Sequence, residues 1–142
     1  MNEHGRDFFE QMATCRDAYR RLGDAIYQVI APCGDVLDLG AGLGYVAGRL
    51  NERGIDVMAS DLYAPETLCE PPAHMWLRNR VDLKAPMPRE MVNADVFDVV
   101  ICTETAEHIP EAFADAVVAS VARRARSTIV WSAASLWISS MR

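Results

Sequence analysis

Short apolar runs alternate with segments of helical composition along most of the chain. The runs at 36–39, 55–60, 75–81, 97–102 and 127–133 are rich in the aliphatic and β-branched residues of strands buried on both faces. Helical composition lies between them at 45–53, 64–69 and 111–124. Consecutive βα units joined by right-handed crossovers predict an α/β fold, a three-layer sandwich with a mostly parallel sheet of strand order 3-2-1-4-5.

The first 30 residues carry an apolar stripe at alternating steps of four and three. Its members are Phe8, Met12, Cys15, Tyr19, Leu22, Ile26 and Val29. This spacing predicts a helix, bent at Gly23, whose apolar side packs on the core.

The composition is that of one globular domain, 1–142, with an N-terminal helical segment at 1–30 and an α/β core at 31–142. A formal net charge of −6 argues against nucleic acid as a partner. Without a signal peptide or an apolar run of about 18 residues, we expect no membrane span and a cytoplasmic protein. The four cysteines form no CxxC pair, so we expect no zinc site and no disulfide framework.

A glycine-rich turn follows the first predicted strand and precedes a helix. Its pattern is Asp38-x-Gly40-x-Gly42-x-Gly44, which differs from the G-x-G-x-x-G of dinucleotide sites. Glycines let the backbone turn sharply and approach a ligand closely. The Asp38 carboxylate would repel a pyrophosphate but suits an ammonium or sulfonium group. A tight turn without a ligand is the alternative interpretation.

At this point the sequence resembles the class I S-adenosylmethionine-dependent methyltransferases, whose first motif VLDLGAGLGYVAGRL matches closely. The resemblance implies S-adenosyl-L-methionine as cofactor, bound by Asp38, Gly40, Ala41, Gly42 and Gly44. In this family, helices before the first strand often cover the cofactor and shape the acceptor pocket, a role that Tyr19 or Arg20 could serve.

Two further carboxylates follow the second and third predicted strands. Asp61 can accept hydrogen bonds from both ribose hydroxyls; alternatively it caps a helix or forms a turn. The resemblance implies that Asp61 and the next residue, Leu62, belong to the cofactor site. The resemblance implies that Asp82 contacts the adenine amino group while the backbone at Leu83 reads the ring edge. Asp82 could instead simply terminate the strand.

The segment FDVVICTETAEHI at 97–109 resembles the fourth motif of the family. The match implies that Thr103 touches the cofactor and that Glu104 lies beside it. Branches that methylate small molecules share the spacing of Glu104, Glu107 and His108. We take His108 and Glu104 as catalytic candidates, with His108 as the base that accepts a proton from a hydroxyl or amine. Alternatively, His108 orders the loop that leads into the next helix.

The family adds a sixth and a seventh strand, for which 135–142 is too short. We therefore expect an open edge at the fifth strand and self-association there or through the apolar C-terminal segment; a truncated sequence is the alternative. The function predicted is methyl transfer from S-adenosylmethionine to an unidentified small molecule. The main alternative is a non-catalytic binding protein or subunit for S-adenosylmethionine or S-adenosylhomocysteine, and a nucleotide-binding oxidoreductase is disfavoured by the glycine spacing.

Overall fold

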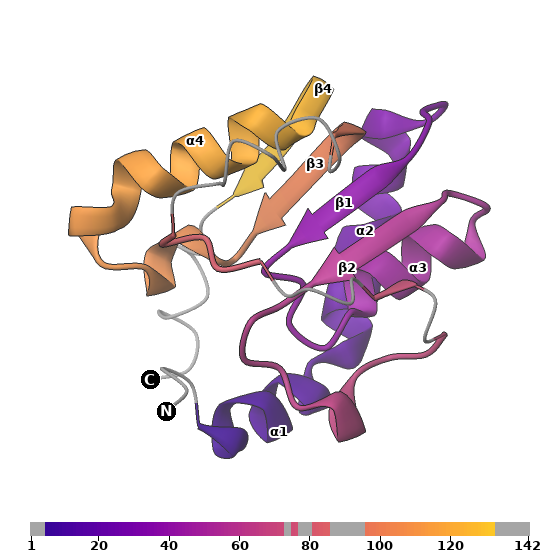
Figure 1. Ribbon diagram of the computed structural model, residues 1–142. Helices are drawn as coiled ribbons and strands as arrows, with labels where there is room; N and C mark the ends of the chain where they lie inside the picture. Colours follow the sequence, from indigo (N-terminus) through magenta and orange to yellow (C-terminus); the bar gives the residue numbers. More distant parts are fainter. Residues whose placement is uncertain (1–4, 73–74, 77–80, 86–95, 133–142) are drawn as a thin grey trace.

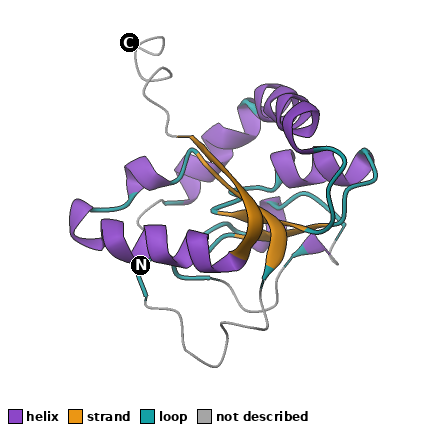
Figure 2. Cartoon of the chain, turned by 90° about the horizontal axis from the view of Figure 1, so that it is seen from above, coloured by secondary structure: helices purple, strands orange, loops and turns teal. Residues whose placement is uncertain are grey.

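The computed structural model describes residues 5–72, 75–76, 81–85 and 96–132. Its centre is a parallel sheet of β1 (Val36–Leu39), β2 (Val57–Ser60), β3 (Phe97–Thr103) and β4 (Ala125–Ser132), in the order β2-β1-β3-β4. Helices lie on both sides of this sheet (Figures 1 and 2). The predicted α/β class and order are confirmed, because β3 and β4 are the fourth and fifth predicted strands.

The third predicted strand is described only in part. Trp76 forms an isolated parallel bridge with Ala59 of β2, and 77–80 lie outside the described residues. Since β1 occupies the other side of β2, the bridge places Trp76 at the predicted outer position.

Alternation along the strands gives each face of the sheet its own apolar core. Val36, Val99 and Ile101 pack with α2 (Arg16–Ile30) and α3 (Tyr45–Glu52). Leu37, Leu39, Val100 and Cys102 pack with α4 (Ala114–Arg124) on the other face. All four residues of β1 are buried, as expected for a central parallel strand.

The N-terminal segment differs from the prediction. It forms two helices, α1 (Arg6–Thr14) and α2, which meet at Cys15, and Gly23 lies within α2. The Thr14 hydroxyl donates to the Gln11 carbonyl, and the Cys15 N–H bonds to Met12 three residues back. These local bonds end α1. Val29 of the predicted stripe is 76% exposed, so it does not belong to the core.

Two of the predicted helices are also shorter or less regular than expected. Only the 3-10 helix η1 (Glu66–Leu68) forms within 64–69. The segment 111–124 begins with another 3-10 helix, η5 (Glu111–Phe113), before α4. Within the described part of the chain, no helix has the length and apolar character needed to cross a membrane.

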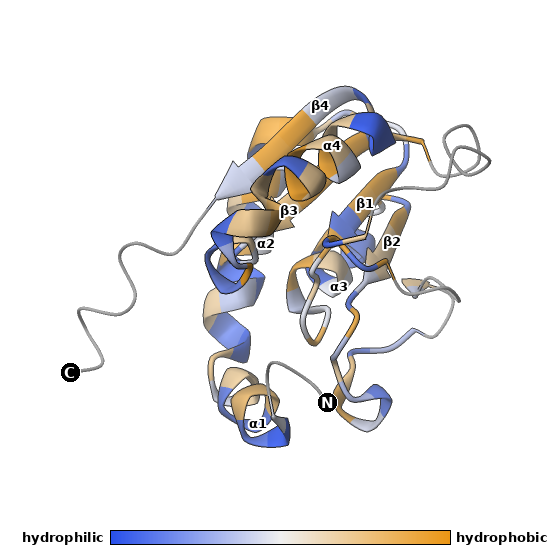
Figure 3. Cartoon of the chain, turned by 60° about the vertical axis from the view of Figure 1, so that its left-hand side comes forward, coloured by the Kyte–Doolittle hydropathy of each residue, from blue (hydrophilic) through white to orange (hydrophobic). Residues whose placement is uncertain are grey.

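Among the described strands, β4 pairs with β3 alone and forms one edge of the sheet. Its middle is hydrophobic (Figure 3), and Ile129 and Trp131 are 43% and 41% exposed. The C-terminal segment 135–142 lies outside the described residues. Self-association through this edge or the C-terminal segment stays a prediction.

Close packing and ion pairs hold α2 against α3. A Cβ added at Gly23 would lie 2.9 Å from Arg49 Cβ and 3.2 Å from the Val46 carbonyl oxygen. Asp24, the next residue, accepts from Arg49 at 2.9 Å and pairs with Arg53 at 2.6 Å. The position of α2 against α3 therefore depends on glycine, which has no side chain, at position 23.

Gly23→Val should lower the free energy of unfolding by about 1–3 kcal/mol, because the new side chain forces the two helices apart. Ala25→Val, at an exposed site on the same helix, is the matched control and should cost less than about 0.7 kcal/mol. Urea unfolding followed by circular dichroism measures both. Equal losses of unfolding free energy in the two variants would show that close packing at Gly23 does not stabilise the protein.

Candidate cofactor-binding and catalytic site

The turn after β1 is shaped by glycines and fastened to the end of β2. Gly40 and Gly42 have φ of 69° and 56°, in the left-handed region that favours glycine. The N–H groups of Gly40 and Ala41 both donate to the Ser60 carbonyl, at 2.8 and 3.0 Å. A Cβ at Gly42 would meet the end of the Met12 side chain. The backbone of the turn at Gly42 thus faces α1 with no side chain of its own in between.

Asp61 holds this turn from the end of β2. Its Oδ2 accepts from the Gly42 N–H at 2.9 Å, and its Oδ1 accepts from the N–H groups of Tyr63 and Ala64 at 2.9 and 2.8 Å. The turn-forming interpretation of Asp61 is therefore correct. The same carboxylate lines the main cavity, so a ligand role is compatible with it.

Thr105 joins the glycine turn to the loop after β3. Its hydroxyl lies 3.2 Å from the Gly40 carbonyl and 2.9 Å from the Thr103 carbonyl. Thr105 was not among the predicted site residues. A hydroxyl two residues after a strand is a signal for such a local bond, but its contact with Gly40 depends on the neighbouring positions of β1 and β3.

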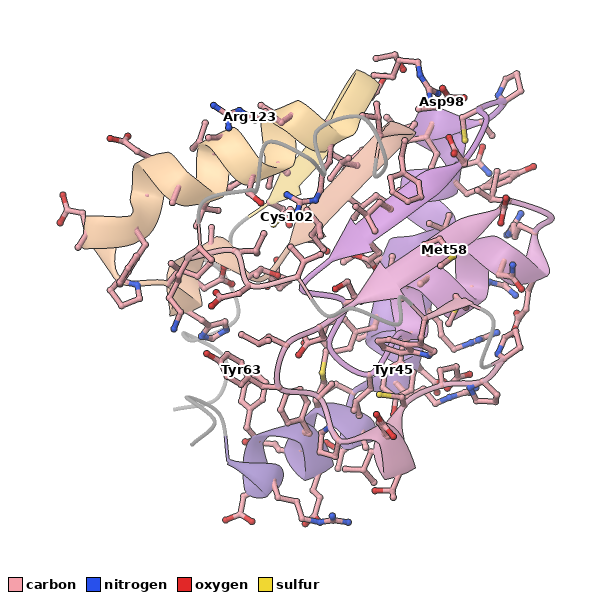
Figure 4. The ribbon with its side chains drawn as sticks, in the orientation of Figure 1. Tyr45, Met58, Tyr63, Asp98, Cys102 and Arg123 are labelled. Atoms are coloured by element: carbon pink, nitrogen blue, oxygen red, sulfur yellow. The ribbon has the colours of Figure 1, made fainter. Side chains whose placement is uncertain are left out.

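The main cavity has a volume of about 400 Å³ and lies between α1, α2 and the carboxyl ends of the strands. Figure 4 shows Tyr63 between α1 and these strand ends. Eight predicted site residues line the cavity: Gly40, Gly42, Asp61, Leu62, Asp82, Leu83, Glu104 and His108.

A smaller hollow of about 20 Å³ adjoins the main cavity. It contains the predicted residues Asp38, Ala41 and Thr103, and shares Gly40 and Glu104 with the larger space. Thr103 is the last residue of β3, where the sequence placed the first residue of the loop.

Gly44 lines neither space. It is the N-cap residue of α3, and a Cβ there would strike Trp76. Arg20 also lies elsewhere, paired with Glu52 at 2.6 Å.

Asp38 is a buried carboxyl in the middle of the sheet. It is 2% exposed, and none of the described residues donates a hydrogen bond to it. Burial, together with the negative charge of Asp61, raises the pKa of Asp38 to about 8. A cation in the adjoining hollow would stabilise its ionised form.

Glu104 is held in an unusual backbone conformation at the end of β3. It has φ of 55°, uncommon for a residue with a Cβ. Its N–H donates to the Ser132 carbonyl at 3.1 Å, and its Oε1 accepts from the Ser132 hydroxyl at 3.2 Å. Burial raises the pKa of Glu104, the charge of Glu107 adds to this rise, and the Ser132 bond opposes it.

His108 lies in the 3-10 helix η4 (Ala106–His108) and packs against α1. The rings of His108 and Phe8 meet edge to face, with their centroids 5.7 Å apart. The His108 N–H donates to the Thr105 carbonyl at 3.1 Å. The side chain of His108 thus packs on α1 and lines the cavity; its role as a base or in ordering the loop stays a prediction.

Asp82 likewise combines a turn with a place on the cavity wall. Its Oδ1 accepts from the Lys84 N–H at 2.9 Å, which agrees with its interpretation as a strand terminator. Among the described residues, no group of three or more His, Cys, Asp or Glu side chains is placed to hold a metal ion.

Comparison with solved structures finds the same arrangement of helices and strands. No family model and no curated protein matches the chain. The glycopeptide N-methyltransferase MtfA matches, in complexes with sinefungin and with S-adenosyl-L-methionine. Identity is 19% and the TM-score 0.58 for both, covering 75% of this chain and 49% or 50% of the MtfA chain. The chain has a class I methyltransferase fold.

A second match supports this assignment of the fold. A SAM-dependent methyltransferase from Archaeoglobus fulgidus is 16% identical, with a TM-score of 0.56, over 79% of this chain and 48% of that one. The chain spans about half the length of the solved structures it matches. In a class I methyltransferase fold, the turn after β1 faces the ligand crevice at the carboxyl ends of the strands, where the cavity lies here.

Asp38→Asn should stabilise the ligand-free chain increasingly as the pH rises from about 4 to about 8. Over this range the folded parent keeps a proton on Asp38 that the unfolded chain releases, because its pKa is raised from 3.8 to about 8. The parent's free energy of unfolding therefore falls with pH, by at most about 1.4 kcal/mol per pH unit. Asparagine has no proton to release in this range, so the variant does not lose stability in this way as the pH rises.

Urea unfolding at a series of pH values measures the difference between variant and parent. Asp56→Asn removes a negative charge from an exposed residue and serves as the matched control. A difference for Asp38→Asn that stays constant across the range would show that the folded parent holds no proton there.

Proposed function

We propose that this chain binds S-adenosyl-L-methionine in the main cavity and transfers its methyl group to a small-molecule acceptor. One observation carries the proposal. The glycine turn after β1, Asp61 after β2 and Asp82 farther along the chain wall a single cavity of about 400 Å³. This volume lies within the range of small-molecule and cofactor pockets.

The larger space suits the nucleoside part of the cofactor. In this proposal Asp61 accepts hydrogen bonds from the ribose hydroxyls, while Asp82 and the backbone at Leu83 recognise the adenine. Leu62, between the two carboxylates along the chain, contributes an apolar wall. The backbone at Gly42 can approach the ligand closely because it carries no side chain.

The smaller hollow suits the ammonium group of the cofactor's methionine part. Its volume of about 20 Å³ admits one small group, and Asp38 and Thr103 contribute to its wall. A cation there would give the buried Asp38 carboxyl a partner, which supports a ligand bearing an ammonium group. When bound, the cofactor supplies a methyl group already activated by its sulfonium.

Glu104 and His108 lie on the loop after β3 and face the acceptor in this proposal. They hold the nucleophile in line with the methyl group, and positioning of this kind can supply much of the rate. A chain that binds the cofactor but transfers no methyl group is the alternative.

Calorimetric titration should show selective, micromolar binding of S-adenosylhomocysteine, with NAD and ATP as negative controls. The carboxylates of Asp61 and Asp82 on the cavity wall disfavour a polyphosphate at this site. A folded chain that fails to bind S-adenosylhomocysteine would exclude the proposed function. Binding without transfer of radiolabel from S-adenosylmethionine to small molecules in an extract would favour the binding-protein alternative.

Gly42→Ala and Gly54→Ala form a matched pair that tests the pocket. Both positions have positive φ, 56° and 84°, so each alanine should cost about 1–2 kcal/mol of stability. A Cβ at Gly54 points into open space, whereas one at Gly42 meets Met12 at the cavity wall. Titration should show about 10-fold weaker binding for Gly42→Ala only, a loss of about 1.4 kcal/mol.

Equal affinities in these two variants would place the ligand elsewhere on the molecule. Circular dichroism before each titration establishes that both variants are folded, so that weak binding is read as a property of the site.

A further inference from the structure

We propose that the methyl acceptor is an amine, bound as an ammonium ion among Glu104, Glu107 and Tyr19 at one end of the main cavity. This inference rests on the proposed function, because it assigns the other end of the same cavity to the cofactor. It adds a substrate class, and it adds Tyr19 and Glu107 to the residues that hold the substrate.

The charges around the cavity favour a cation. Four carboxylates line it, those of Asp61, Asp82, Glu104 and Glu107, against one ammonium group, that of Lys84. Asp61 and Asp82 belong to the nucleoside end in the proposed function. Glu104 and Glu107 come from the loop after β3, so two negative charges face the remaining space.

Tyr19 lines the cavity together with these two carboxylates. It reaches the cavity from α2 and lines both the main space and the smaller hollow. Burial, and also the charges of Glu104 and Glu107, raises the pKa of Tyr19 to about 12. Its hydroxyl therefore keeps its proton near neutral pH, and its oxygen can accept a hydrogen bond from an ammonium N–H.

The rest of the wall is aromatic and aliphatic. Phe8, Tyr63 and Ile109 line the cavity together with Tyr19. Aromatic faces attract cations in addition to packing with apolar groups. The contact of Phe8 with His108 closes the wall between α1 and the loop after β3. These surfaces fit an amine carried on an apolar or aromatic skeleton.

The reaction requires that the ammonium lose one proton before it attacks. In this proposal an N–H proton passes to the Glu104 carboxylate, whose pKa is raised by burial. The freed nitrogen lone pair forms the N–C bond as the S–C bond breaks. The electron pair of that bond stays on sulfur, which becomes a neutral thioether. The product nitrogen carries the positive charge until it releases a proton to solvent.

A pair of probes of matched shape tests the charge preference. The chain, saturated with S-adenosylhomocysteine at pH 7, is titrated with 2-phenylethylamine, which is protonated at this pH, and with 2-phenylethanol. The amine should bind at least about 10-fold more tightly than the alcohol, because only the amine carries a charge that the carboxylates attract.

Glu107→Gln and Glu111→Gln are the matched variants for this experiment. Glu107 lines the cavity, whereas Glu111 is an exposed residue of the following 3-10 helix outside its lining. Glu107→Gln should reduce the preference for the amine to about 3-fold or less while leaving the affinity for the alcohol unchanged. Glu111→Gln should keep the full preference. If Glu107 had only a structural role, Glu107→Gln would weaken the binding of both probes alike.

The outcomes separate this inference from the proposed function. If S-adenosylhomocysteine binds but the amine and the alcohol bind equally, the acceptor is not selected as a cation, and the inference is overturned while the cofactor site stands. Equal behaviour of the two variants overturns it as well. If a folded chain does not bind S-adenosylhomocysteine, the proposed function itself fails, and this inference fails with it.

Discussion

The bonds of Asp61 to the backbone fix the geometry on which the cavity depends. One carboxylate joins the Gly42 N–H to the turn that follows β2 through Tyr63 and Ala64. The Ser60 carbonyl, one residue earlier, accepts from Gly40 and Ala41. The glycine turn and the end of β2 are therefore a single hydrogen-bonded unit. Its conformation is set before any ligand arrives, which reduces the conformational entropy that binding must remove.

Most of the sheet could be predicted because its strands are buried on both faces. Val36–Leu39 and Phe97–Thr103 are continuous apolar runs apart from Asp38, Asp98 and Thr103, and such runs indicate central parallel strands. The break at Cys15 could not be predicted in this way. It results from a hydroxyl bond of Thr14 and a shortened turn at Cys15, neither of which disturbs the spacing of the apolar residues.

The residues of the candidate site likewise include some that the sequence could predict and some that it could not. Residues that directly follow predicted strands, such as Asp61 and Glu104, could be assigned to the site from their motifs, and the carboxyl ends of parallel strands share one edge. Tyr19 was only one of two candidates for the acceptor pocket, and Thr105 was not predicted at all, because the positions of both depend on the tertiary structure. Tyr19 lines the cavity from α2, which packs closely on α3 at Gly23, and Thr105 reaches Gly40 because β1 and β3 are neighbours.

Asp38 is a residue of the central strand that does not contribute to the stability of the core. Its neighbours in β1, Leu37 and Leu39, are fully buried and contribute to the core. A buried carboxyl without a hydrogen bond from the described residues opposes folding instead. Local rules of this kind are broken mostly at functional sites. Thr105 bonds to the glycine turn beside Asp38, and the next residue back, Glu104, has a strained backbone. The cost at Asp38 and the strain at Glu104 thus lie on the wall of one hollow.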